Sequence, residues 1–232
     1  MQGSAISGVN GNLMVLSICL SVCISAAGSW LLLRAMIPQL RCILLDKPNA
    51  RSSHYLPTPR GGGFAFVLVG AVSSYLYWLA SVGTSRPFSG STLFVLPLVA
   101  LPVALVGLFD DRQNLPASWR FIAQMLNAVL LLWLSPLSLT LLALPLLLIA
   151  ITAVINFSNF MDGIDGLVAG CMAVSISTLT IKLSAPWPIW SLVGALLGFL
   201  LWNWSPAKVF MGDVGSTFLG AVFAGLVLQA PS

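Results

Sequence analysis

Charge is scarce in this sequence. Only 7% of its 232 residues are charged and 58% are hydrophobic, whereas roughly 25% of the residues in a soluble domain are charged. Glutamate is absent, and histidine occurs once, as His54. The net charge of +4 is better explained by basic loops on one side of a membrane than by nucleic-acid binding. We therefore expect a membrane protein with no nucleic-acid partner.

Several catalytic signatures are also missing. The chain has no Walker A, HExxH or GxSxG motif, so the usual marks of a P-loop enzyme, a zincin or an α/β-hydrolase are lacking. A single histidine argues against a histidine-rich zinc site or a Ser–His–Asp triad. The four cysteines form no CxxC pair, and buried small apolar side chains are their simplest interpretation.

Long apolar runs recur along the whole chain. In lipid, helices satisfy every backbone polar group internally, so we predict an all-α polytopic bundle of about eight transmembrane helices in one domain, residues 1–232. No positive charge precedes the first run, which favours a retained span over a cleaved signal peptide. The fourth run is short and begins at Arg120, so it is expected to start at the interface. The predicted spans are 13–36, 63–82, 92–109, 119–134, 137–155, 166–184, 189–203 and 216–230.

Lysine and arginine predict the orientation of these spans. Eight of the ten fall on one side, which the positive-inside rule assigns to the cytoplasm, with both termini outside. Only Arg86 and Lys182 fall on the other side. All six acidic residues are aspartates on the predicted cytoplasmic side, and they are Asp46, Asp110, Asp111, Asp162, Asp165 and Asp213.

The longest polar loop, residues 38–62, contains His54 and ends in TPRGGG with Arg60. Three glycines that open a helix leave backbone N–H groups uncovered, and helix N-termini favour anions. The simpler interpretation is a solvated connector that touches anionic lipid.

Paired carboxylates follow in GLFDDRQN, where Asp110 and Asp111 end the third span. Adjacent acids repel each other, and a helix C-terminus is already negative, so a cation is expected between them. In NFSNFMDGIDGL, a helix or tight turn would place Asn159, Asp162 and Asp165 on one face, beside glycines that admit a ligand. Such hard oxygen ligands suit Mg²⁺ or a Mg²⁺-bound diphosphate, although a glycine turn with acidic caps has the same composition.

The last polar segment, NWSPAKVFMGDVGS, precedes the eighth span. It combines a carboxylate at Asp213, an aromatic ring at Phe210 and a cation at Lys208. These groups could bind a metal, a base and a phosphate, whereas an interfacial turn with an aromatic anchor is the plainer alternative.

The four motifs, DKPNARSSHYLPTPRGGG, GLFDDR, NFSNFMDGIDGL and NWSPAKVFMGDVGS, resemble in order those of the polyprenyl-phosphate N-acetylhexosamine-1-phosphate transferases. The resemblance covers about residues 40–220 and favours the O-antigen-type branch over the peptidoglycan branch. It implies transfer of a sugar 1-phosphate from a UDP-N-acetyl sugar to undecaprenyl phosphate, with release of UMP. It also implies Mg²⁺, with Mn²⁺ as an alternative, at the cytoplasmic face of a bacterial inner membrane.

The resemblance assigns roles to individual positions. Asp213 would bind the metal together with Asp110, and Phe210 would stack on uracil. The predicted catalytic carboxylates are Asp110, Asp111, Asp162 and Asp165. The predicted substrate-binding residues are Asn159, Asn203, Lys208, Phe210, Arg120, Arg60 and His54.

The family's usual later spans and histidine-rich loop are not found before Ser232, so an inactive fragment is one alternative. A CDP-alcohol phosphotransferase would require DGxxAR where this chain has DGIDGL. A transporter would place carboxylates at mid-bilayer, and a membrane scaffold would leave the acids unexplained. Membrane lipids are expected partners, and the sequence leaves open whether the chain forms a homodimer.

Overall fold

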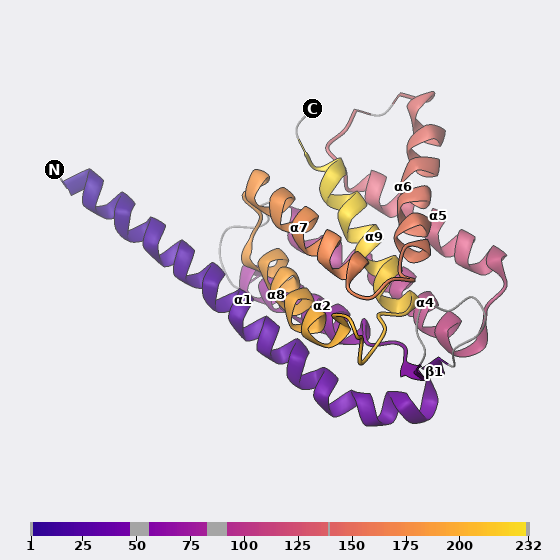
Figure 1. Cartoon of the computed structure of the whole chain (residues 1–232). Helices are drawn as coiled ribbons and strands as arrows, with labels where there is room; N and C mark the ends of the chain where they lie inside the picture. Colours follow the sequence, from indigo (N-terminus) through magenta and orange to yellow (C-terminus); the bar gives the residue numbers. More distant parts are fainter. Residues whose placement is uncertain (1, 47–55, 83–91, 139, 231–232) are drawn as a thin grey trace.

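The computed structural model describes residues 2–46, 56–82, 92–138 and 140–230 (Figure 1). Two strands of two residues each, β1 (Leu45–Asp46) and β2 (Thr58–Pro59), pair antiparallel. All other regular elements described are helical, which confirms the predicted all-α class. The helices are α1 (Gln2–Ile43), α2 (Phe64–Val82), η1 (Thr92–Val95), α3 (Leu96–Val99), α4 (Leu101–Gln113), α5 (Ala117–Trp133), α6 (Ala143–Phe160), α7 (Leu167–Lys182), α8 (Trp187–Asn203) and α9 (Asp213–Leu228).

The apolar helices make this a polytopic helical membrane protein. Four segments are long and apolar enough to cross a bilayer, namely Val15–Ile43, Phe64–Val82, Thr92–Gln113 and Ala143–Phe160. The helices α7, α8 and α9 are apolar but shorter. The short fourth run predicted from the sequence corresponds to α5, a 17-residue helix.

Two predicted boundaries are wrong in an informative way. The fifth span was placed at 137–155, but α6 begins at Ala143, where Thr140 accepts the backbone N–H groups of Ala143 and Leu144. The same helix continues to Phe160, so the segment that contains Asn156 and Asn159 is helical. The third span is divided into η1, α3 and α4 and continues to Gln113, which places both aspartates of the acidic pair inside the last helical turns.

Helix α9 forms the centre of the bundle. Every residue from Val214 to Val222 is buried, and α9 packs against α4, α6, α7 and α5 (Figure 1). Helix α8 packs mainly on α1 and α2, while the N-terminal part of α1 extends away from the other helices (Figure 1). A helix buried on all sides fixes the position of its own N-terminus, and Asp213 is the first residue of α9.

The ends of four helices meet around that N-terminus. They are the C-termini of α4 and α6 and the N-termini of α5 and α9. Helix α7 starts at this end, next to Asn203, and finishes at Lys182. Lys182 therefore lies at the opposite end of the bundle, as the predicted sidedness requires, whereas Arg86 lies outside the described residues.

Candidate active site

Helices α4 and α9 cross very closely at the site. A Cβ atom on Gly107 would lie 2.5 Å from the carbonyl oxygen of Asp213, so only glycine allows this approach. One turn after Gly107, the side chain of Asp110 comes within hydrogen-bonding reach of the Asp213 carboxyl group. Two acids that are 103 positions apart in the chain are thereby brought together.

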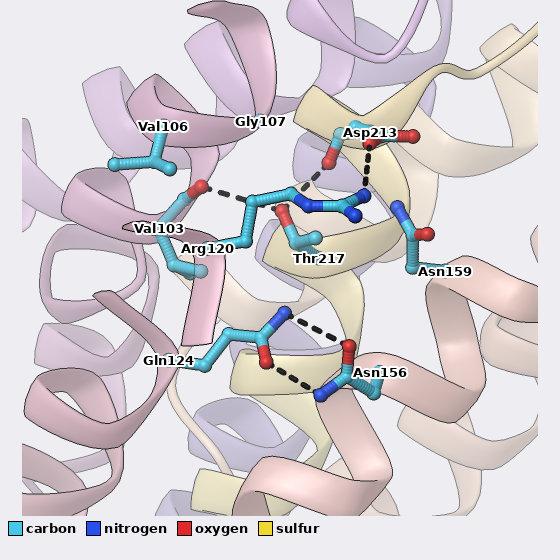
Figure 2. Close-up of a pocket in the computed structure, with 9 residues that line it drawn as sticks. All are labelled: Val103, Val106, Gly107, Arg120, Gln124, Asn156, Asn159, Asp213 and Thr217. Carbon is cyan, nitrogen blue, oxygen red and sulfur yellow. Dashed lines mark hydrogen bonds and ion pairs between the residues drawn. The ribbon is translucent and has the colours of Figure 1, made fainter. Parts of the chain in front are cut away.

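Arg120 lies beside this pair. Its Nη1 is 3.0 Å from Asp110 Oδ2 and 3.9 Å from Asp213 Oδ2 (Figure 2). The second oxygen of Asp110 accepts the backbone N–H of Leu115 at 2.6 Å. Asp110 is 7% exposed, so its charge is balanced by a guanidinium and a turn N–H rather than by water.

Below Arg120 the pocket narrows to a polar floor (Figure 2). Gln124 and Asn156 exchange two amide hydrogen bonds, of 2.6 Å and 3.3 Å. The cavity between this amide pair and Asp213 has a volume of about 20 Å³, which is enough for one water molecule.

Asn159 and Asp162 also face the acids. The Nδ2 of Asn159 donates to Ser216 Oγ at 3.1 Å, and its side chain lies within hydrogen-bonding reach of Asp213. Burial raises the pKa of Asp162 well above its usual range, and the carboxylates of Asp213 and Asp111 raise it further. These two residues therefore join the cluster that the sequence predicted.

Asp111 does different work from its neighbour. Its two oxygens accept the backbone N–H groups of Asp213 at 3.0 Å and Val214 at 3.2 Å. An acid is favourable at a helix N-terminus because the unpaired N–H groups and the helix dipole are positive there. The predicted catalytic role is therefore corrected, since Asp111 anchors the start of α9.

Asp165 also departs from the prediction. Helix α6 ends at Phe160, so the expected single face breaks and Asp165 turns away from Asn159. Its Oδ2 accepts the backbone N–H of Ala207 at 2.9 Å. Asp165 therefore holds the 204–212 loop and is not a member of the acid cluster.

Two predicted substrate ligands have structural partners instead. Asn203 is 4% exposed; its Oδ1 accepts from the Gly166 N–H, and its Nδ2 donates to the Val209 carbonyl. The Nζ of Lys208 lies 5.5 Å from the centre of the Trp202 ring. Asn203 thus bridges two backbone segments, and Lys208 makes a cation–π contact.

The glycine triplet does not offer its N–H groups to an anion. Gly62 and Gly63 donate to the carbonyl groups of Phe210 and Met211, both at 2.9 Å. A Cβ on Gly63 would lie 2.5 Å from the Cα of Gly215. The expected anion site is therefore wrong, because these glycines are needed for close packing of two backbones.

The remaining predictions have mixed outcomes. Arg60 forms a 3.0 Å ion pair with Asp46 and is close enough to lower the pKa of Asp162, against the larger effect of burial. Phe210 is partly exposed, and its N–H donates to the Pro59 carbonyl; uracil stacking stays a prediction. His54 lies outside the described residues.

The donor set fits a magnesium ion that is shared with a substrate. Over the described ranges, no three histidine, cysteine, aspartate or glutamate side chains group tightly enough to hold a metal alone. Mg²⁺ commonly takes only one or two carboxylates from the protein and the rest from phosphate and water. Asp110 and Asp213 supply such a pair, and the Arg120 guanidinium now provides a cation between them.

Comparison with known proteins places this site in a family. Residues 93–230 match the family model described as glycosyl transferase family 4. The chain belongs to glycosyl transferase family 4. The match includes α4 to α9, and therefore every side chain that faces the acid cluster except Arg60.

Named relatives of this glycosyl transferase family 4 chain are polyprenyl-phosphate enzymes. It is 29% identical to a probable undecaprenyl-phosphate N-acetylglucosaminyl 1-phosphate transferase of Bacillus subtilis, covering 76% of this chain and 52% of the relative. It is 31% identical to a phospho-N-acetylmuramoyl-pentapeptide-transferase of Prochlorococcus marinus, covering 86% and 64%. A decaprenyl-phosphate N-acetylglucosaminephosphotransferase of Mycobacterium tuberculosis is 36% identical, with 76% and 51% covered. The chain thus spans between about half and two thirds of these relatives.

Three residues of the pocket were missed from the sequence. Gln124 lies four positions after Arg120 on α5, and Asn156 lies three positions before Asn159 on α6. Helical spacing puts each on the face of a predicted site residue, so this signal was available. Nothing local marks Gly107, because its importance depends on the approach of α9.

Proposed function

We propose that this chain carries the catalytic centre of a transferase that moves a sugar 1-phosphate from a UDP-N-acetyl sugar to undecaprenyl phosphate. The meeting of Asp110, Asp162 and Asp213 beside Arg120 carries this proposal. The names of the family 4 relatives support a polyprenyl phosphate acceptor. The reaction would start lipid-linked glycan synthesis at the cytoplasmic face of a bacterial inner membrane.

In this proposal Asp213 and Asp110 hold Mg²⁺, with Mn²⁺ as the alternative, together with diphosphate oxygens. Bound Mg²⁺ would neutralise the diphosphate and stabilise UMP as it leaves. Neutral donors from Asn159 complete the surroundings of Asp213. Two carboxylates are appropriate because the substrate itself brings several negative oxygens.

The chain's residues would mainly position groups and stabilise charge, which is what phosphoryl transfer requires. An oxygen of the lipid phosphate forms a bond to the β-phosphorus of the UDP-sugar, and the bond from that phosphorus to the UMP oxygen breaks. The second pKa of phosphomonoesters is near 6, so the attacking phosphate is largely dianionic and a strong general base is unnecessary. Arg120 is placed to stabilise negative charge, and Phe210 is proposed to stack on the uracil.

An apolar cavity offers a path for the lipid. A cavity of about 450 Å³ lies between α4 and α5, where Phe109, Trp119 and Leu126 are among its lining residues. Val106 lines both this cavity and the polar pocket. We assign the polyprenyl chain to it, since this places the lipid phosphate near Arg120.

Filling that cavity should weaken acceptor use alone. For Ala123→Trp we expect a raised KM for undecaprenyl phosphate and an unchanged KM for UDP-GlcNAc. The control is Leu197→Trp, on the exposed surface of α8, which should change neither. Equal effects of both variants would remove the assignment.

The decisive experiment uses Asp213→Asn in the complete product of the reading frame. UMP–UDP-GlcNAc exchange and transfer to undecaprenyl phosphate are measured in detergent with Mg²⁺. We expect at least a roughly 100-fold loss of both, the effect typical of losing one preorganised electrostatic group. Asp46→Asn, the same change in the β1–β2 hairpin, should stay within a few-fold of wild type. Full activity of Asp213→Asn would refute the proposal.

A further inference from the structure

Arg120 contacts its two acidic neighbours unequally. Its Nη1 makes a 3.0 Å hydrogen bond with buried Asp110, whereas the distance to Asp213 Oδ2 is 3.9 Å, beyond hydrogen-bonding range. The side chains of Arg120 and Asp213 are 42% and 29% exposed. Asp213 is therefore the partner that Arg120 can release at lower cost.

We propose that Arg120 is a resident counter-ion of the acid pair, which competes with a divalent metal for Asp213 and then binds phosphate oxygens of the substrate. This inference depends on the proposed function for the metal and the phosphate ligand. A divalent ion on the same carboxylates would lie beside a guanidinium of like sign, and like charges a few ångströms apart oppose each other's binding. Arg120 must therefore withdraw, at least from Asp213, for the metal to bind tightly.

The shape of the pocket sets the direction of that movement. Beneath Arg120, the cavity of about 20 Å³ has room for a water molecule but not for a guanidinium. Gln124 and Asn156 close its floor and satisfy each other's amides. The exposed side is the remaining route, and it leads toward the solvent from which a nucleotide diphosphate arrives. Arg120 would then form a charge-assisted bond with phosphate, for which its geometry is well suited.

Metal affinity in the absence of nucleotide tests this idea without relying on turnover. Mn²⁺ binding to the purified full chain is followed by electron paramagnetic resonance for wild type, Arg120→Gln and Arg112→Gln. Arg112 is the matched control, because it is an arginine at the end of α4 but lines the separate cavity that includes Met36, Leu44 and Phe64. We expect roughly tenfold tighter Mn²⁺ binding for Arg120→Gln, which loses a unit charge about 4 Å from the carboxylate, and less than twofold for Arg112→Gln.

The second measurement is UDP binding at saturating Mn²⁺. Arg120→Gln should bind UDP at least fivefold more weakly than wild type, so that its two affinities change in opposite directions. A purely structural ion pair would not produce this crossing. Arg120→Lys, which keeps the charge but has a compact ammonium, should lie between wild type and Arg120→Gln in both assays, and it serves if Arg120→Gln does not fold.

The outcomes are distinct. Unchanged or weaker Mn²⁺ binding in Arg120→Gln, or an equal gain in Arg112→Gln, would overturn the counter-ion role while leaving the transferase proposal intact. If wild type itself binds no Mn²⁺ in the presence of UDP, the metal assignment of the proposed function fails as well.

Discussion

The polar pocket and the neighbouring glycine seam contain the same residue types but use them differently. We define the glycine seam as Gly61–Gly63 packed against Val209–Gly215. In the seam, backbone N–H groups are paired with backbone carbonyls or with Asp111. In the pocket, Asp110 and Asp213 face each other and share one arginine. Aspartate beside glycine therefore indicates a polar turn, and only the partners of each carboxylate tell a site from a support.

The largest contrast is expected between two aspartate-to-asparagine changes. Asp110→Asn should lower transfer activity at least roughly 100-fold with little change in melting temperature, because it removes charge from the reacting centre. Asp165→Asn should retain activity within about tenfold and lose stability, since the amide replaces an acceptor of the Ala207 N–H. Activity and thermal unfolding in detergent distinguish the two, and the reverse pattern would invert the comparison.

The seam should be sensitive to a single methyl group. In Gly63→Ala, the new Cβ would lie 2.5 Å from the Gly215 Cα, and overpacking of this kind costs about 1–3 kcal/mol. The control is Gly170→Ala on α7, where a Cβ would meet no atom within 4 Å. We expect a lower melting temperature for the first variant only. Equal melting temperatures would show that the two backbones can separate without cost.

Removal of the α9 cap should have a smaller effect. Asp111→Ala leaves the N–H groups of Asp213 and Val214 without their acceptor, and loss of an N-cap costs about 0.5–2 kcal/mol. Thermal unfolding measures this change. Asp111→Asn, which retains an acceptor oxygen, should recover part of the loss; no difference between the variants would argue against capping.

The smallest effect concerns pH and stability. Because the pKa of Asp162 is raised on folding, the folded state holds this proton more tightly than the unfolded chain. Stability from the protonated form is complete below the unfolded pKa near 3.8 and is lost as pH rises through the folded value. In EDTA, Asp162→Asn should therefore melt above wild type at pH 7.5, and the difference should shrink as pH falls toward 4. A constant difference would contradict the prediction.

The sequence by itself determined the helical membrane class and the set of polar motifs. Its low charge and long apolar runs leave helices as the way to satisfy the backbone in lipid. Motif order was enough to indicate the family, which the match over residues 93–230 confirms. Helical spacing could also have found Gln124 and Asn156.

Only the tertiary structure decided which polar groups work together. Asp110 and Asp111 are neighbours with the same chemistry, yet one faces Arg120 and the other caps α9. The choice depends on the crossing of α4 and α9 at Gly107, which brings together segments about 100 residues apart. A local pattern lists the acids that a chain carries, but a carboxylate's role depends on the charges and N–H groups that packing brings to it.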